Sequence, residues 1–80
     1  MRYHLEIIKD IGEFLSANKL SEELTDFQNE IQAGTTGSEL CLRVGSWLKS
    51  NKTDGLKELA DEFILYCHAN GLYPKKRSLS

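Results

Sequence analysis

The side chains best suited to bind a metal are two histidines and two cysteines, but their spacing does not suit that chemistry. His4, Cys41, Cys67 and His68 lack the short spacings, such as C-x₂-C or H-x₃-H, that hold zinc. The adjacent Cys67 and His68 would point about 100° apart on a helix. We therefore expect Cys67 to fill the core, His68 to lie on the surface, and the chain to bind neither a metal nor a cofactor.

Two cysteines are too few for the disulfide scaffold of a small secreted domain. A single bridge between Cys41 and Cys67 is an alternative to two free thiols. No apolar run approaches the roughly 18 residues that a membrane span needs. The first four residues also lack the apolar stretch of a signal peptide. These features predict a cytoplasmic protein that does not bind membranes.

The segment 34–39, with the sequence GTTGSE, combines glycines and hydroxyl groups in a way that is typical of some phosphate-binding loops. A Walker loop requires Gly-Lys-Ser/Thr after a strand, whereas this segment has no lysine and Glu39 would repel an anion. Thr36 and Glu39 have the T-x-x-E spacing of a capping box, and Gly34 suits the position after a helix end. We interpret the segment as a tight corner between two helices.

A catalytic site needs a nucleophile beside a base, or two carboxylates across a cleft, and the sequence suggests neither arrangement. Its two histidines lie near opposite ends of 80 residues. A helical domain of this size also has little room for a pocket of roughly 300 Å³ or more. We expect no enzymatic activity.

Acidic residues form the most informative pattern in the chain. Two sets recur at helical spacing: Glu6, Asp10 and Glu13, then Glu22, Asp26 and Glu30. Like charges stacked on one helix face cost a few tenths of a kcal/mol per pair, so an outside reason such as a basic partner is expected. The helix dipole stabilises Glu22, which lies early in its helix, but it does not explain Glu13, Asp26 or Glu30.

The formal net charge of −2 hides an uneven distribution along the chain. Residues 1–40 carry eight acids and three Lys or Arg residues, whereas residues 41–80 carry four acids and seven Lys or Arg residues. Nucleic-acid binding requires a clustered basic surface, so the acidic first half argues against it.

Four amphipathic segments predict an all-α fold. Apolar residues recur with helical periodicity over residues 3–17, 21–33, 37–50 and 54–70. Their short connections favour antiparallel neighbours, so we expect a compact four-helix bundle or an orthogonal four-helix array. Residues 1–74 then form a single helical domain and residues 75–80 a flexible basic tail. Gly12 and Gly45, within two of these helices, indicate the close approach of a neighbour.

Two leucines fall outside the apolar faces of their helices. Leu42 lies about 150° from the centre of its apolar face, and Leu65 lies nearly opposite its own. The acids Glu58, Asp61 and Glu62 precede Leu65 by three to seven residues and are expected to share one outer face of the helix with it. A leucine among carboxylates suits a partner whose apolar pocket is bordered by Lys and Arg.

We therefore predict a small acidic protein-binding module that covers the basic groove of a partner, such as a toxin or a nucleic-acid enzyme. Inhibitors, immunity proteins and antitoxins are analogous in size and charge. The predicted contact residues are Glu13, Glu22, Asp26, Glu30, Leu42, Glu58, Asp61, Glu62 and Leu65.

Two other functions compete with this prediction. One is a homodimeric protein that pairs Leu42 and Leu65 across a two-fold axis. The other is a helix-turn-helix regulator whose recognition helix spans residues 38–50. The acids on residues 21–33 would repel DNA phosphates and disfavour that alternative.

Overall fold

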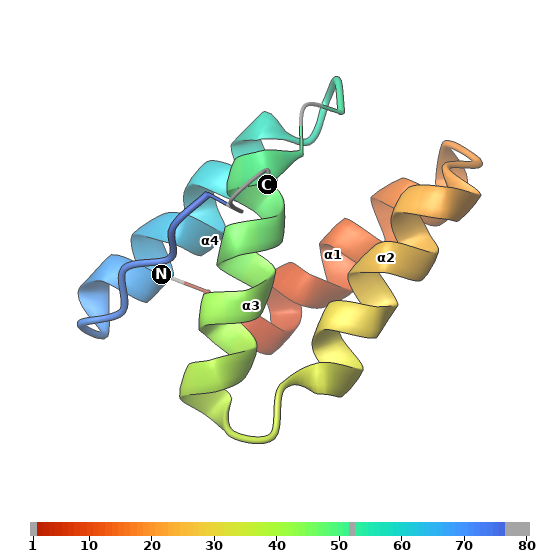
Figure 1. The fold of residues 1–80 in the computed structure, drawn as a ribbon. Coiled ribbons are helices and arrows are strands. Elements are labelled where there is room, and N and C mark those ends of the chain that lie inside the picture. Colours follow the sequence, from red (N-terminus) through yellow and green to blue (C-terminus); the bar gives the residue numbers. More distant parts are fainter. Residues whose placement is uncertain (1, 52, 77–80) are drawn as a thin grey trace.

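Four helices make up the described part of the chain, which confirms the predicted all-α four-helix arrangement. The computed structural model describes residues 2–51 and 53–76, and this part of the chain contains no strand. The helices are α1 (His4–Ala17), α2 (Ser21–Ala33), α3 (Gly37–Ser50) and α4 (Lys57–Ala69). Figure 1 shows α2 and α3 diverging from the turn that joins them.

Each helix packs mainly against two others. α1 contacts α2 and α4, and α3 contacts the same two helices, so the four helices form a closed ring of neighbours. After α4 the chain turns back and runs along that helix toward α3 (Figure 1). The surface between α2 and α3 and the surface between α3 and α4 therefore have only α3 in common.

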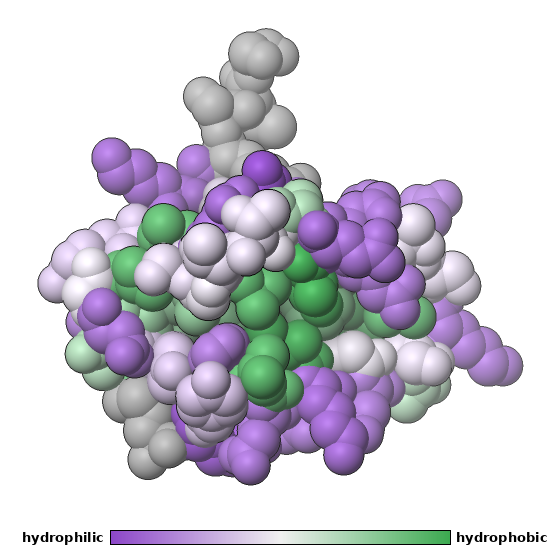
Figure 2. Space-filling view, turned by 90° about the horizontal axis from the view of Figure 1, so that it is seen from below, coloured by the Kyte–Doolittle hydropathy of each residue, from purple (hydrophilic) through white to green (hydrophobic). Residues whose placement is uncertain are grey.

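The apolar stripes of all four helices meet in one core. The most deeply buried side chains are Ile7, Ile11, Leu15, Phe27, Val44, Phe63 and Cys67. The ring of Trp47 lies in the same core and packs on Phe27, with the ring centroids 5.1 Å apart. Figure 2 views the molecule from the side of the α2–α3 turn and shows hydrophobic side chains in the middle of that face, bordered by hydrophilic ones. Some hydrophobic side chains are thus exposed on this side.

The corner between α2 and α3 agrees with the predicted capping box in part. The hydroxyl of Thr36 accepts a hydrogen bond from the Glu39 amide at 3.1 Å. The Glu39 carboxylate does not return to Thr36 but accepts a hydrogen bond from Thr35 at 2.9 Å. Gly34 has a φ of −79°, so it does not adopt the left-handed conformation of a helix-ending glycine. A Cβ at Gly34 would lie 2.8 Å from the Cα of Leu40, so close approach of the backbone explains the glycine.

The predicted start of α4 was wrong by three residues. The helix begins at Lys57 rather than at residue 54, because the preceding residues form a turn. Gly55 adopts a φ of +87° in this turn, which a helix does not allow. A Cβ on Gly55 would lie 2.9 Å from the Phe14 ring, so the turn also packs closely on α1.

The expectation for Gly12 was wrong, because no atom lies within 4 Å of the position where its Cβ would be. At Gly45 the expected close neighbour exists, but it consists of Pro74 after α4 as well as Ile64 on α4. A Cβ there would lie 2.7 Å from Cβ of Pro74 and 3.3 Å from Cδ1 of Ile64 on α4. Gly45 therefore makes room for the proline ring.

Pro74 is buried, so the segment 72–76 is attached to the helices through its centre. Of the basic tail predicted over residues 75–80, Lys75 and Lys76 are exposed. Residues 77–80 lie outside the described part of the chain.

Candidate functional site

Arg2 joins acids from two helices and accounts for part of the acidic pattern. Its Nε and Nη2 donate to the two carboxylate oxygens of Glu62 at 2.8 and 2.7 Å. Its Nη1 donates to Asp10 on α1. The hydrogen bonds from Arg2 lower the pKa of the Glu62 carboxyl, and those to Glu62 and Asp10 raise the pKa of Arg2. Glu62, a predicted contact residue, thus has a partner sixty residues away in the same chain.

Arg43 likewise pairs with two acids, one on α2 and one on α3. Its Nη1 lies 3.3 Å from Glu30 on α2, and its Nε lies 3.2 Å from Glu39 on its own helix. Hydrogen bonds from Thr35 and then from Arg43 lower the pKa of Glu39. Glu30, which the helix dipole left unexplained, is therefore matched by a base inside the protein.

The seven acids among the nine predicted contact residues thus fall into two groups. Glu13, Glu30 and Glu62 take part in intramolecular ion pairs, the first of them with Lys9 at 3.9 Å. The other acids are exposed and form no ion pair with another described residue; they are Glu22, Asp26, Glu58 and Asp61. Early helix positions explain Glu22 and Glu58, so Asp26 and Asp61 have no internal explanation.

Leu42 on α3 and Glu30 on α2 meet in a shallow hollow between the two helices. This acidic hollow has a volume of about 330 Å³ and is lined by Glu30, Glu39, Leu42, Arg43 and Ser46. Leu42 is 38% exposed, as its position outside the apolar face predicts. The structure therefore brings together two predicted contact residues, Glu30 and Leu42, from different helices.

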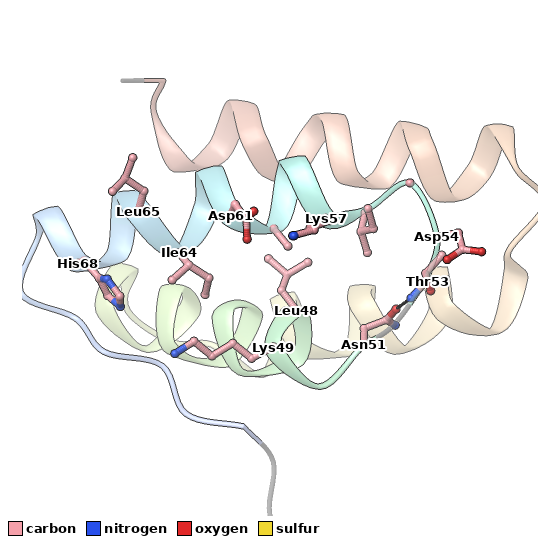
Figure 3. A pocket seen from close by; sticks show the side chains of 13 residues that line it. Leu48, Lys49, Asn51, Thr53, Asp54, Lys57, Asp61, Ile64, Leu65 and His68 are labelled. Carbon is pink, nitrogen blue, oxygen red and sulfur yellow. Dashed lines mark hydrogen bonds between the residues drawn. The ribbon is translucent and has the colours of Figure 1, made fainter.

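Leu65 and Asp61 lie at a second place, a groove between α3 and α4. This α3–α4 groove has a volume of about 610 Å³, and Leu48 and Ile64 face each other in it (Figure 3). Leu65 is 59% exposed and lines one edge. Four of the predicted contact residues are therefore divided between two places, with Glu30 and Leu42 in the acidic hollow and Asp61 and Leu65 in the α3–α4 groove.

An aromatic cluster at the start of α1 was not predicted. His4 is buried, and its Nδ1 lies 3.1 Å from the hydroxyl of Tyr66 on α4. Tyr3 packs edge-on against Tyr66 with the ring centroids 6.3 Å apart. Burial lowers the pKa of His4 and raises that of Tyr66. The position of His4 one helical turn before Ile7 and Ile8 was the signal that placed it on the buried face.

Three exposed apolar side chains were also missed. Tyr3, Leu5 and Tyr73 are 55%, 51% and 65% exposed. The ring of Tyr73 lies 5.2 Å from that of His68. Tyr73 follows the end of α4, so no helical periodicity marks its direction.

Cys41 and Cys67 are both buried as free thiols. The thiol of Cys67 donates to the carbonyl oxygen of Cys41 at 3.7 Å, which joins α3 and α4. Burial raises the pKa of Cys67 to about 12 and raises that of Cys41 as well. These thiols are core residues of low reactivity.

Within residues 2–51 and 53–76, no group of three or more His, Cys, Asp or Glu side chains is arranged to hold a metal ion. No helix in this part of the chain is long and apolar enough to cross a membrane. No protein-family model matches the chain, and no curated protein or solved structure shows significant similarity to it.

Proposed function

We propose that this protein is a binding module that recognises a basic partner protein through the acidic hollow and the adjoining edge of α2. The observation that supports it best is the position of Leu42. This exposed leucine lies in one hollow with the carboxylates of Glu30 and Glu39. An apolar side chain bordered by carboxylates fits a partner surface on which Lys or Arg residues surround an apolar pocket.

The charge on this side of the molecule is negative even after the internal ion pairs are formed. Arg43 carries one positive charge against the two carboxylates of Glu30 and Glu39. Glu22 and Asp26 are exposed on the same side of α2, since residues four apart lie one above the other on a helix. From Glu22 to Glu30 these carboxylates cover about 12 Å along the helix axis.

Such an edge would act by occlusion. A row of carboxylates that occupies a basic groove prevents phosphate groups from binding there, and electrostatic attraction speeds the encounter with the partner. Inhibitors, immunity proteins and antitoxins of nucleic-acid-acting proteins work in this manner, and we place the chain in this functional class. The proposal involves no catalytic step and no cofactor.

Binding of a basic amphipathic helical peptide tests the recognition chemistry directly. We expect Asp26→Lys and Leu42→Ser each to weaken binding by about tenfold, because each removes a contact at the centre of the surface. Glu13→Lys on α1 is the matched control for charge, and we expect it to have less than about a threefold effect at physiological salt, where separated surface charges are screened.

The affinity of each protein variant is measured by calorimetric titration with the basic peptide. The same titration with a peptide in which every lysine is replaced by glutamate gives the comparison. If Glu13→Lys weakens binding as much as Asp26→Lys, the attraction depends on net charge alone and the acidic hollow is not the site. If Leu42→Ser weakens binding but Asp26→Lys does not, the partner is apolar rather than basic.

A further inference from the structure

The α3–α4 groove carries unpaired charges of both signs around an apolar floor. Leu48, Leu56 and Ile64 are among the apolar residues that line it. Lys49 and Lys57 lie on its edges together with Asp54 and Asp61. None of these four charged side chains forms an ion pair with another described residue.

The balance of charge determines which kind of partner fits this groove. A purely basic partner would satisfy the two aspartates and be repelled by the two lysines, and a purely acidic partner would have the opposite difficulty. A surface that offers both signs, next to an apolar side chain, matches the groove on every count. The protein itself has such a surface on α4.

That surface is a straight row along α4. Lys57, Asp61 and Leu65 are spaced four residues apart, so they lie one above another on one side of the helix. Leu65 is 59% exposed and points away from the groove floor (Figure 3). From the start of α4 onward, the row thus presents a positive charge, a negative charge and an apolar side chain.

We propose that the α3–α4 groove is the interface of a homodimer, in which the α4 helices of two copies lie antiparallel across a two-fold axis. An axis level with Leu59 places Lys57 of each copy opposite Asp61 of the other, because these residues lie two positions before and after it. The same symmetry makes the contact self-complementary, so each charge pair occurs twice.

The antiparallel arrangement also provides a place for the exposed leucine. Leu65 lies six positions after the axis, so it meets the second copy beyond the start of its α4, next to the turn that precedes that helix. Leu56, in that turn, is one of the apolar residues that line the groove. Leu65 of each copy then fills the groove of the other, and burial of the two leucines drives association.

Sedimentation velocity over a concentration series tests the proposal. We expect the wild-type chain to pass from monomer to dimer, and Lys57→Asp and Asp61→Lys each to weaken the dimer by about tenfold or more through like-charge repulsion. An equimolar mixture of the two variants should dimerise again, because opposite charges then face each other at both contacts. Leu65→Ser should weaken the dimer without the possibility of such rescue.

Glu6→Lys on α1 is the matched charge reversal, since Glu6 is exposed and lies outside α3 and α4, and it should leave the dimer constant unchanged. All three α4 positions are exposed, so circular dichroism should show the helical content of the wild type in every variant. A wild-type chain that stays monomeric overturns the proposal. So does a dimer that the α4 variants leave intact, or a variant mixture that remains monomeric. Because the acidic hollow lies between α2 and α3, these results are independent of the peptide titration.

Discussion

Replacing Gly45 by alanine tests whether Pro74 attaches the C-terminal segment to α3. The new Cβ would lie 2.7 Å from Cβ of Pro74 and 3.3 Å from Cδ1 of Ile64, so one of the neighbours has to move. The segment 72–76 lies outside the helices, whereas α3 packs against both α2 and α4. We therefore expect the segment to leave its place and α3 to stay.

The expected magnitude combines two opposing effects. The three methylene groups of the proline ring contribute about 0.8 kcal/mol each when buried, so exposing Pro74 costs about 2.4 kcal/mol. Alanine favours the helix over glycine by about 1 kcal/mol. The net loss is about 1.4 kcal/mol, which lowers the melting temperature of a chain of this size by about 6–11 °C.

The assay is a double-mutant cycle measured by urea unfolding. In a Pro74→Gly background the obstructing ring is absent and only Cδ1 of Ile64 has to shift slightly, so Gly45→Ala should stabilise the protein by up to about 1 kcal/mol. Gly12→Ala is the control, since no atom lies within 4 Å of its Cβ position, and it should give a similar gain. Faster tryptic cleavage after Lys75 in Gly45→Ala would report the released segment. A stabilising Gly45→Ala in the wild-type background would refute the packing of Pro74 on α3.

Three further predictions concern the corner, the buried histidine and the arginine that joins α1 to α4. Gly34→Ala should destabilise the protein, because its Cβ would lie 2.8 Å from backbone; a melting temperature equal to that of the wild type would contradict this. Burial lowers the pKa of His4, so the unfolded chain takes up the proton first and the free energy of unfolding falls as the pH drops below the ordinary value of 6.5. His4→Gln should flatten that part of the pH profile in urea titrations, and an unchanged profile would exclude His4 as its cause. Arg2→Gln should raise the pKa of Glu62 toward its ordinary value, and a carboxyl carbon NMR titration that shows no change would remove Arg2 as the cause.

Helical periodicity was sufficient to predict the fold, because each helix buries a regular apolar stripe. Phe27, Val44 and Phe63 occupy the positions that their 3.6-residue pattern requires. The predicted start of α4 failed where local signals compete. Thr53 and Asp54 resemble helix caps, but the left-handed Gly55 keeps them in a turn.

The candidate site was harder to predict because ion pairs between distant residues leave no local signal. Arg2 and Glu62 are sixty positions apart, and no spacing rule connects them. Glu30 looked unexplained for this reason, although Arg43 on α3 pairs with it. The contact between Pro74 and Gly45 could not be predicted either, because an extended segment has no periodicity that indicates its packing.

The two buried thiols make the contact between α3 and α4 a reporter of rare opening motions. Cys67 and Cys41 lie in the core, and a thiol with a pKa of about 12 is almost entirely protonated at neutral pH. A thiol-specific reagent therefore reacts only in the fraction of molecules in which the helices have separated. The rate of labelling, taken separately in Cys41→Ala and Cys67→Ala, gives the free energy of that separation from the native thiols, without an engineered cysteine.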